Sequence, residues 1–314
     1  VVVRRPPLDG VLATAHDMRR EWRFISALRP TPVPVPEPIA FDAGELLGVP
    51  CYAMAHVEGV VLHDAASAAA LDTAARRAVS LALVDTMAAL HAVDIDAVGL
   101  GDIAKRGDYL GRQLRRWRRQ WEASVCTDVT AVAEAHRLLE AAAPQQRRTS
   151  TVHGDLRLGN VICGSGGDVR AVLDWELATL GDPLADLGWL LSYWTEPGGP
   201  EAPPPGPGAQ PSVLPGFPRR AELAARYAER SGADLDDLEV YLAFASWRSA
   251  CISAGVLTRY QSGAMGDDGF DHRSLRDAVV ERAETALAHL GARPRTARSG
   301  HAATATAPRP SEAP

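Results

Sequence analysis

Residues 151–176 constrain the fold of this chain more than any other segment, because polar residues interrupt an apolar strand pattern at fixed places. A strand end leads into a His-Gly-Asp turn, where Gly154 permits a tight backbone before Asp155. Asn160 follows five positions after Asp155, and two short strand patterns then bring the chain back to Asp174. We therefore expect the three oxygen-bearing side chains of Asp155, Asn160 and Asp174 to meet at one end of a small sheet.

Such a group of side chains indicates a particular kind of chemistry. Carboxylate and amide oxygens, with coordination positions left for water and phosphate, are the ligands that Mg²⁺ prefers. A nearby carboxylate that is not bound to the metal can accept a proton from an attacking hydroxyl. The opposing interpretation is a chance loop of turn residues, since Asp and Asn are common in turns. The ordered spacing between apolar strands favours the functional interpretation.

The composition excludes several classes of protein. The chain has 314 residues with 39 acidic against 33 basic side chains, and a net charge of −6 argues against coating nucleic acid. No run approaches the ~18 apolar residues that span a bilayer, so no membrane-integral protein is expected. The four cysteines are far apart and show no metal-binding spacing, which favours a reducing, cytoplasmic location.

The first sixty residues mix strands with one helix. Residues 1–4 have a strand pattern, residues 17–28 have helical periodicity, and residues 38–41 and 49–57 form an expected antiparallel hairpin. From residue 65 the chain becomes rich in alanine and leucine, so the boundary between two lobes is placed near residue 60. The predicted parts are an N-terminal lobe at 1–59, a helical lobe at 60–292 and a disordered tail at 293–314.

The helical lobe is predicted from apolar periodicity and from its interruptions. Residues 161–163 and 169–173 are expected to be short strands, and the proline- and glycine-rich residues 197–218 to be an irregular loop. The predicted helices are 65–90, 109–122, 129–142, 219–231, 235–260 and 273–290.

The segment HGDLRLGN, with the later LDWE, resembles the catalytic loop and metal-binding aspartate of the aminoglycoside phosphotransferase family. This family is a branch of the protein-kinase-like fold. The longer stretch that ends in ELATLGDPLADLGWLL is similar to the subgroup related to the kinase domain fused to some acyl-CoA dehydrogenases. The resemblance covers about residues 1–290. It implies an α+β, protein-kinase-like two-lobe fold, with a small β-rich N-terminal lobe and a large, mainly helical C-terminal lobe.

The resemblance also implies roles for the loop residues. Asp155 matches the catalytic aspartate that accepts the proton of the acceptor hydroxyl, and Asn160 and Asp174 match the two magnesium ligands. Arg157 stands where protein kinases carry a lysine near the transferred phosphate, with a plain surface arginine as the alternative. His153 is expected to be a structural hydrogen-bonding residue. Structural roles are likewise expected for Glu176, for Asp182 as a helix cap and for Asp186 as an anchor of the catalytic-loop backbone.

A second implied group belongs to the nucleotide. The family has a strand lysine that grips the α- and β-phosphates and pairs with a helix glutamate; this chain offers Arg4 and Glu21 instead. Glu21 lies on the apolar stripe of its helix, and a buried carboxylate needs a cationic partner. Arg5 points to the opposite face of the strand. Arginine is a planar fork and lysine a point charge, so this departure puts the phosphate grip in question.

The strand that ends near residue 59 resembles the one that leads into the hinge between kinase lobes. The resemblance implies that adenine contacts backbone from Ala55 to Val57, with Met54 lining the pocket. An ordinary buried strand is the alternative. A glycine-rich loop over the phosphates is not found, and it would lie before Val1. We therefore expect an N-terminal lobe that is truncated and lacks its first hairpin.

These expectations combine into an ATP- and Mg²⁺-dependent phosphotransferase that acts on a hydroxyl of a small molecule. The alternative is a nucleotide-binding pseudokinase, or sensor module, without turnover. Arg4 and the missing glycine-rich loop favour the alternative, whereas an intact Asp155 disfavours it. No nucleic-acid or membrane partner is expected, and the pattern sets no oligomeric state. Candidates for contacting the acceptor, each with a core role as its alternative, are Trp189, Tyr193, Trp194, Trp247, Arg248 and Tyr260.

Overall fold

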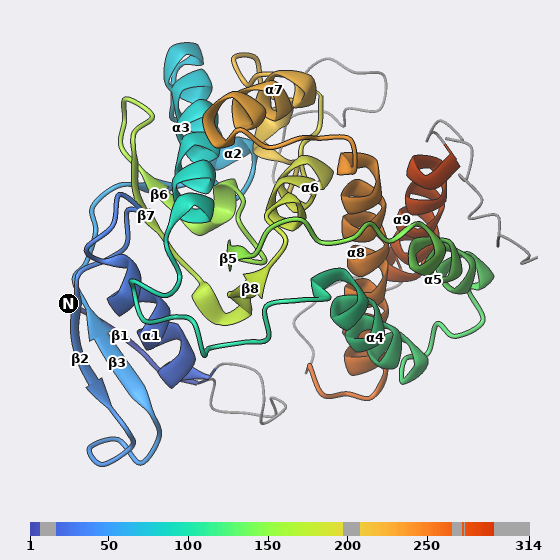
Figure 1. Cartoon of the computed structure of the whole chain (residues 1–314), viewed down its shortest axis with the longest axis horizontal. Helices are drawn as coiled ribbons and strands as arrows, with labels where there is room; N and C mark the ends of the chain where they lie inside the picture. Colours follow the sequence, from blue (N-terminus) through green and yellow to red (C-terminus); the bar gives the residue numbers. More distant parts are fainter. Residues whose placement is uncertain (7–16, 197–207, 266–271, 273, 292–314) are drawn as a thin grey trace, which may run out of the picture.

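The computed structural model describes residues 1–6, 17–196, 208–265, 272 and 274–291. The predicted tail at 293–314 and the first part of the predicted loop at 197–218 lie outside the described residues. Figure 1 shows a small part that contains a sheet and one helix, at the left, beside a larger and mainly helical part. The described chain thus has the predicted α+β division.

The N-terminal sheet has three antiparallel strands in the order β1-β3-β2. They are β1 (Val2–Arg4), β2 (Pro38–Asp42) and β3 (Cys51–Met54), so the predicted hairpin is confirmed. The register places Arg4 opposite Tyr52. Alternation along β1 turns Val3 outward, with 56% of its surface exposed, and directs Arg4 toward the interior.

Helix α1 (Met18–Leu28) packs against this sheet and presents a functional side chain on its buried face. The Asp17 carboxylate caps its first turn by accepting a hydrogen bond from the Arg20 N–H at 3.1 Å. Glu21 is fully buried among the apolar residues of the same face. The helix therefore delivers one carboxylate to the inner side of the sheet.

Contacts across the boundary hold α1 on the larger part. The Arg20 guanidinium donates to the Ala178 carbonyl at 2.8 and 3.1 Å, and to the Ile103 carbonyl at 2.9 Å. Phe24 stacks on Trp175 with ring centroids 6.2 Å apart. The first helix is thus fixed against the segment that follows Asp174.

A second three-stranded sheet, in the order β4-β6-β7, carries the polar turn predicted from the sequence. It consists of β4 (Val60–Val61), β6 (Val161–Cys163) and β7 (Val169–Val172). A separate two-stranded sheet pairs β5 (Ser150–Val152) with β8 (Thr179–Gly181). The chain leaves the N-terminal sheet after Met54 and joins the second sheet at Val60. The β6–β7 pair matches prediction, while β4 and β8 were not predicted.

The predicted helix at 65–90 is two helices, α2 (Ala65–Ala68) and α3 (Thr73–Ala92), so that expectation was wrong. Two aspartates explain the division. Asp64 forms a capping box with Ser67, and the Asp72 carboxylate accepts the Ala75 N–H at 2.7 Å, which starts a new helix. The other helices are α4 (Tyr109–Glu122), α5 (Thr130–Ala142), α6 (Leu184–Ser192), α7 (Arg220–Ser231), α8 (Leu238–Gln261) and α9 (Ser274–Gly291), with short 3₁₀ turns η1 (Leu158–Asn160), η2 (Trp175–Leu177) and η3 (Pro211–Val213).

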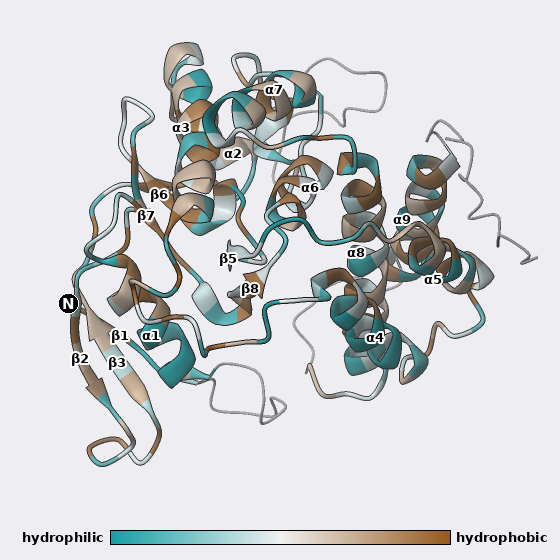
Figure 2. Ribbon diagram, in the orientation of Figure 1, coloured by the Kyte–Doolittle hydropathy of each residue, from teal (hydrophilic) through white to brown (hydrophobic). Residues whose placement is uncertain are grey.

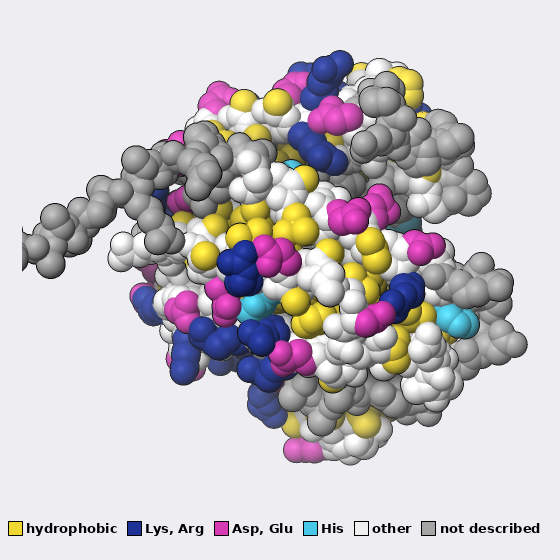
Figure 3. All heavy atoms as spheres, turned by 90° about the vertical axis from the view of Figure 1, so that its right-hand side faces the viewer, with side chains coloured by type: hydrophobic (Ala, Val, Ile, Leu, Met, Phe, Trp, Pro, Cys, Tyr) yellow, Lys and Arg dark blue, Asp and Glu magenta, His cyan; other side chains and the backbone are white. Residues whose placement is uncertain are grey.

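Helix α8 forms the centre of the larger part and packs against α9, α6, α4 and α5. In the part of the chain that is described, α8 is also the one helix long and apolar enough to cross a membrane by length and composition. The sequence pattern did not predict such a helix. Of its most apolar stretch, 83% is buried inside the protein. Figure 2 shows hydrophobic colour on β6 and β7, whereas α4 is largely hydrophilic. Figure 3, turned to the side of α5 and α9, shows arginine and lysine side chains gathered on the lower part of that face.

Candidate active site

The turn after β5 has the tight backbone that the sequence predicts. Gly154 has a φ of +83°, and a Cβ there would lie 2.9 Å from the Leu177 carbonyl oxygen. A side chain at this position would meet both backbone strain and a steric clash. Glycine therefore lets the loop before Asp155 approach the turn that follows Asp174.

Asp155 is held by donors on both of its carboxylate oxygens. Its Oδ2 accepts from Asn160 Nδ2 at 2.7 Å, and the same Nδ2 lies 2.8 Å from the Asp155 carbonyl. Its Oδ1 accepts from Trp189 Nε1 at 2.6 Å and lies 3.4 Å from Arg157 Nε. The carboxylate thus has a fixed orientation at the end of the loop.

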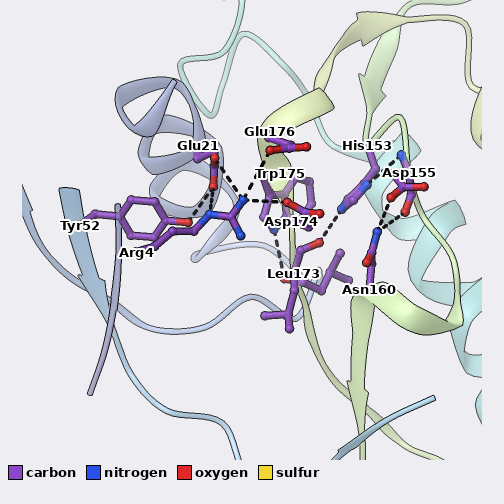
Figure 4. A network of polar contacts seen from close by, with 11 residues as sticks. Arg4, Glu21, Tyr52, His153, Asp155, Asn160, Leu173, Asp174, Trp175 and Glu176 are labelled. Atoms are coloured by element: carbon purple, nitrogen blue, oxygen red, sulfur yellow. Dashed lines mark hydrogen bonds and ion pairs between the residues drawn. The ribbon is translucent and has the colours of Figure 1, made fainter. Parts of the chain in front are cut away.

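Asn160 and Asp174 are brought together by the β6–β7 pair. Val161 lies opposite Val172, and the Leu173 N–H donates to the Asn160 carbonyl at 2.8 Å. Asp174 has a φ of +66°, a left-handed conformation that aspartate tolerates better than most residues. At this turn the chain leaves β7, and the turn lies beside the loop that carries Asp155, as Figure 4 shows.

The donor set fits a magnesium ion of the kind bound with nucleotide phosphates. The Asn160 nitrogen is engaged by Asp155, which leaves Oδ1 as the amide atom that can bind a cation. Asp174 supplies a hard carboxylate oxygen. Within the described residues, no three His, Cys, Asp or Glu side chains form a metal cluster. Magnesium is typically bound by few protein ligands, and phosphate and water complete its coordination shell. It does not typically lie in a cage made of protein ligands alone.

Arg4 joins the two parts of the molecule through a network of carboxylates (Figure 4). Its Nε lies 2.7 Å from Glu21 Oε2, and one terminal nitrogen lies 2.8 Å from Asp174 Oδ1. A third carboxylate, that of Glu176, lies 3.7 Å away. The Tyr52 hydroxyl donates to Glu21 Oε2 at 3.0 Å. The structure therefore brings Arg4 and Glu21 together as the sequence predicts.

Burial sets the electrostatics of this network. Burial raises the pKa of Glu21, while the Arg4 cation and the Tyr52 hydrogen bond act against that increase. Burial likewise disfavours the Arg4 cation, but Glu21 and Asp174 outweigh it, and the pKa of Arg4 is raised. Each group thus favours the charged form of its partner.

The expected structural residues anchor the loop from behind. Asp186, fully buried on α6, accepts the backbone N–H of His153 at 2.7 Å and that of Gly154 at 2.8 Å, which confirms its predicted role. His153 Nε2 lies 2.9 Å from the Leu173 carbonyl. Asp182 accepts the Leu184 N–H at 3.0 Å, at the start of α6. Burial acts to raise the pKa of Asp186, but the His91 hydrogen bond, the neighbouring His91 and His153 rings and the Gly154 N–H lower it overall.

The predicted hinge residues follow β3, and of these Ala55 and Val57 are half-buried while His56 is exposed. The Ala55 N–H donates to the Glu37 carbonyl at 2.9 Å, so it is already engaged. The expected contact of residues 54–57 with a nucleobase stays a prediction, and the half-buried Met54 side chain lies at the end of β3 beside them.

The aromatic candidates divide into two groups. Trp194 and Trp247 are buried, and their ring nitrogens donate to the carbonyls of Pro218 at 2.8 Å and Val132 at 3.0 Å. These two are core residues, which is the alternative that the sequence left open for them. Tyr193 is half-buried and packs against Trp189 with centroids 4.9 Å apart. Tyr260 stacks on the His272 ring.

Two contributors were not recognised from the sequence. Tyr52 was not considered, although its place opposite Arg4 follows once the strand register is known. Trp189 was considered only as an acceptor contact, yet it binds Asp155. Its position three residues after Asp186 puts both on one face of α6, and that spacing could have indicated the loop contact. A cavity of about 640 Å³ between the start of α4 and residues 143–149 has none of the predicted site residues in its lining.

Comparisons with known proteins show the family to which this chain belongs. Residues 1–244 match the Phosphotransferase enzyme family, and the chain belongs to that family. It is 34% identical over 267 residues to acyl-CoA dehydrogenase family member 10 of Mus musculus, covering 84% of this chain and 25% of the mouse protein. It is 32% identical over 291 residues to acyl-CoA dehydrogenase family member 11 of Rattus norvegicus, covering 91% and 37%. The chain thus spans only about a quarter to a third of these curated relatives.

Solved structures show the same fold. A crystal structure from Ralstonia eutropha, assigned as an aminoglycoside phosphotransferase, is 32% identical with a TM-score of 0.74, covering 87% of this chain and 83% of that one. The ADP-bound aminoglycoside phosphotransferase APH(2'')-Ib is 17% identical with a TM-score of 0.54, covering 92% and 87%. The predicted protein-kinase-like fold and the predicted family resemblance are confirmed.

Proposed function

We propose that the protein transfers the γ-phosphate of ATP to a hydroxyl group of a small molecule, with Mg²⁺ as cofactor. The observation that carries this proposal is the meeting of Asp155, Asn160 and Asp174 at one end of the β6–β7 sheet, with Arg4 beside them. A base, two metal ligands and a phosphate-binding cation are the parts that phosphoryl transfer requires.

Asp155 is the proposed general base. Its two oxygens accept hydrogen bonds from Asn160 and Trp189, but each keeps a second lone pair for the acceptor hydroxyl. As the hydroxyl oxygen attacks the γ-phosphorus, its proton passes to the Asp155 carboxylate. The bond from phosphorus to the β,γ-bridging oxygen breaks, and ADP leaves with that oxygen. Arg157 is one-third exposed beside Asp155 and is suited to the oxygens of the transferred group.

The nucleotide would be held from both sides. Arg4 is the proposed contact for the α- and β-phosphates, oriented by Glu21, and the segment from Met54 to Val57 is the proposed contact for the base. Asn160 Oδ1 and Asp174 would hold magnesium, which neutralises the charge that develops on the phosphate oxygens. The proposal is supported by relatives of the same fold, since spectinomycin phosphotransferase APH(9)-Ia was solved with ADP and spectinomycin.

The alternative is a module that binds nucleotide without turnover. It is favoured by one observation, the direct contact of Arg4 with Asp174, because a carboxylate neutralised by arginine is a weaker metal ligand. An intact Asp155 disfavours it. A reducing, cytoplasmic location is also part of the proposal, since all four cysteines are buried and unpaired.

The deciding experiment follows labelled phosphate from γ-labelled ATP into a panel of hydroxylated small molecules and into water. Asp155→Asn is the test variant. Asp168→Asn is its matched control, because Asp168 is exposed in the β6–β7 turn and pairs only with Arg170 among the described residues. Transfer by the wild type and the control, but not by Asp155→Asn, would support the enzyme. Binding of Mg²⁺-ATP without transfer to any acceptor would support the sensor module.

A further inference from the structure

An unusual arginine lies behind the candidate active site. Arg248, in the middle of α8, is only 5% exposed. No carboxylate in the described part of the chain forms an ion pair with it, and its buried Nε has no hydrogen-bond partner there. Burying a charge without a counter-charge is unfavourable, and a methionine would fill similar space without that cost. The position of this cation therefore calls for a reason other than packing.

Arg248 contacts the loop through an indole ring. Its guanidinium carbon lies 4.0 Å from the centre of the Trp189 ring and 5.1 Å from that of Trp117, so two indoles flank the cation. The Trp189 ring nitrogen donates to Asp155 Oδ1 at 2.6 Å. A cation on the face of an indole draws electron density from the ring, which makes its N–H a stronger donor. The contacts thus run from Arg248 through Trp189 to the carboxylate.

Arg248 also contacts the backbone directly. One of its terminal nitrogens donates to the Gly154 carbonyl at 2.8 Å. The Gly154 N–H donates to the Asp186 carboxylate, also at 2.8 Å. The glycine before Asp155 is therefore held on one side by a negative group and on the other by a positive group. These two contacts fix the direction in which the Asp155 side chain leaves the loop.

We propose that Arg248 is a positioning residue for Asp155, acting through the Trp189 indole and the Gly154 carbonyl. This inference deepens the proposed phosphotransfer and rests on it. Arg248 is too deeply buried to touch a substrate, and its effect is on the orientation of the carboxylate that accepts the proton. A fixed base raises the rate because the reacting groups meet in the productive geometry more often.

The first test needs no turnover. The seven tryptophans give indole N–H signals in a nitrogen–proton correlation spectrum, and Trp189→Phe identifies the Trp189 signal by its loss. In Arg248→Met we expect the Trp189 indole proton to exchange with solvent at least tenfold faster and to move upfield. The Trp194 proton, which is bonded to the Pro218 carbonyl, should keep its exchange rate. An unchanged Trp189 proton in folded Arg248→Met would overturn the proposal.

The second test separates positioning from a general structural role. With water as acceptor, Arg248→Met should lower kcat for Mg²⁺-ATP hydrolysis at least tenfold while KM for ATP stays within twofold. In the Asp155→Asn background the same substitution should cause no further loss, since its target is already gone. Equal losses in both backgrounds would overturn the proposal. Arg226→Met, a surface variant paired with Asp85, is the control.

Two further variants keep both tests informative. Arg248→Lys retains the charge but not the planar stack, so we expect only partial recovery of kcat. If Arg248→Met does not fold, Trp189→Phe still removes the N–H that reaches Asp155, and it should lower kcat without changing KM for ATP. Trp247→Phe is its control, because that indole donates only to the Val132 carbonyl among the described groups. If the wild type transfers phosphate to no acceptor, water included, the proposed function fails, while the exchange measurement still decides whether Arg248 holds Asp155.

Discussion

Arg4 lies 2.8 Å from Asp174, and this ion pair joins the first strand of the chain to a carboxylate 170 positions later. The two side chains are 29% and 33% exposed, so water screens the pair and its direct contribution to stability is about 1 kcal/mol or less. Its importance is geometric. Arg4 also binds Glu21, and one guanidinium thereby aligns a helix, an edge strand and the turn after β7.

Replacing Arg4 should make stability depend more strongly on pH. Burial already raises the pKa of Glu21, and Arg4→Met removes the cation that opposes this increase. A carboxyl whose folded pKa is raised favours folding below its unfolded value of about 4.3, and that contribution is lost as pH rises through the folded pKa. We expect the urea midpoint of Arg4→Met to fall more steeply than that of the wild type as pH rises from about 5 to 8. Arg5→Met, at the exposed residue directly after β1, should match the wild type, and a parallel decline in all three proteins would contradict the prediction.

Removing the Asp174 carboxylate should weaken nucleotide binding only where binding depends on magnesium. Asp174→Ala deletes the proposed ligand that joins metal and phosphates, while Arg4 keeps its contact with Glu21. We expect calorimetry to show that Mg²⁺ increases the affinity of the wild type for ATP and leaves the affinity of Asp174→Ala unchanged. Asp168→Ala is the control. Magnesium dependence that survives in Asp174→Ala would place the metal site elsewhere.

Asp155→Asn should abolish turnover and spare binding. The amide cannot take a proton, and a general base contributes about 10²–10⁴-fold in rate. Its oxygen can still accept the Trp189 N–H, and the new amide nitrogen would face Asn160 Nδ2. Because the Asp155 side chain is 19% exposed, unlike the fully buried Asp186, water can satisfy that nitrogen and the loop should keep its shape. We expect affinity for Mg²⁺-ATP to stay within a few fold of the wild type. Near-normal turnover in this variant would show that another group accepts the proton.

Asp186→Asn should destabilise the whole protein. Its two oxygens accept the N–H groups of His153 and Gly154, and an amide would turn a donor toward one of those donors. Disrupting such a buried charged contact costs about 3–5 kcal/mol. The lowered pKa of Asp186 means that its stabilisation is present above the unfolded value and is lost as pH falls through the folded pKa. Thermal melts from pH 7 downward should show a steeper loss in the wild type than in Asp186→Asn, which keeps the other carboxylates of lowered pKa, with Asp236→Asn as a surface control.

The sequence was sufficient for the parts of the fold that depend on local periodicity. Helix α1, helices α4 to α9 other than α6, and the β2–β3 and β6–β7 hairpins have apolar spacing and turn residues that are visible along the chain. The anchoring role of Asp186 was also predictable, since a carboxylate on an apolar helix needs nearby donors. Strands β4 and β8 were not predictable, because two or three residues carry no periodic signal and pair with segments far along the chain.

The candidate site was predictable as a set of residues but not as a set of contacts. Asp155, Asn160 and Asp174 follow one another in a short and recognisable order. Contacts such as that of Trp189 with Asp155 depend on how α6 packs against the loop, which no local pattern specifies. For the same reason, an aromatic side chain at helical spacing gave no sign of whether it packs in the core, as Trp247 does, or faces a ligand.

Helix α1 is tied on two sides, to Arg4 and Tyr52 through Glu21, and to the carbonyls of Ala178 and Ile103 through Arg20. The N-terminal sheet, this helix and the segment directly before β8 are consequently linked by the protein's own side chains. The spacing between the two parts of the protein is therefore preorganised. A ligand that enters between the two parts would find their relative position already fixed. The protein would therefore lose little conformational entropy on binding it.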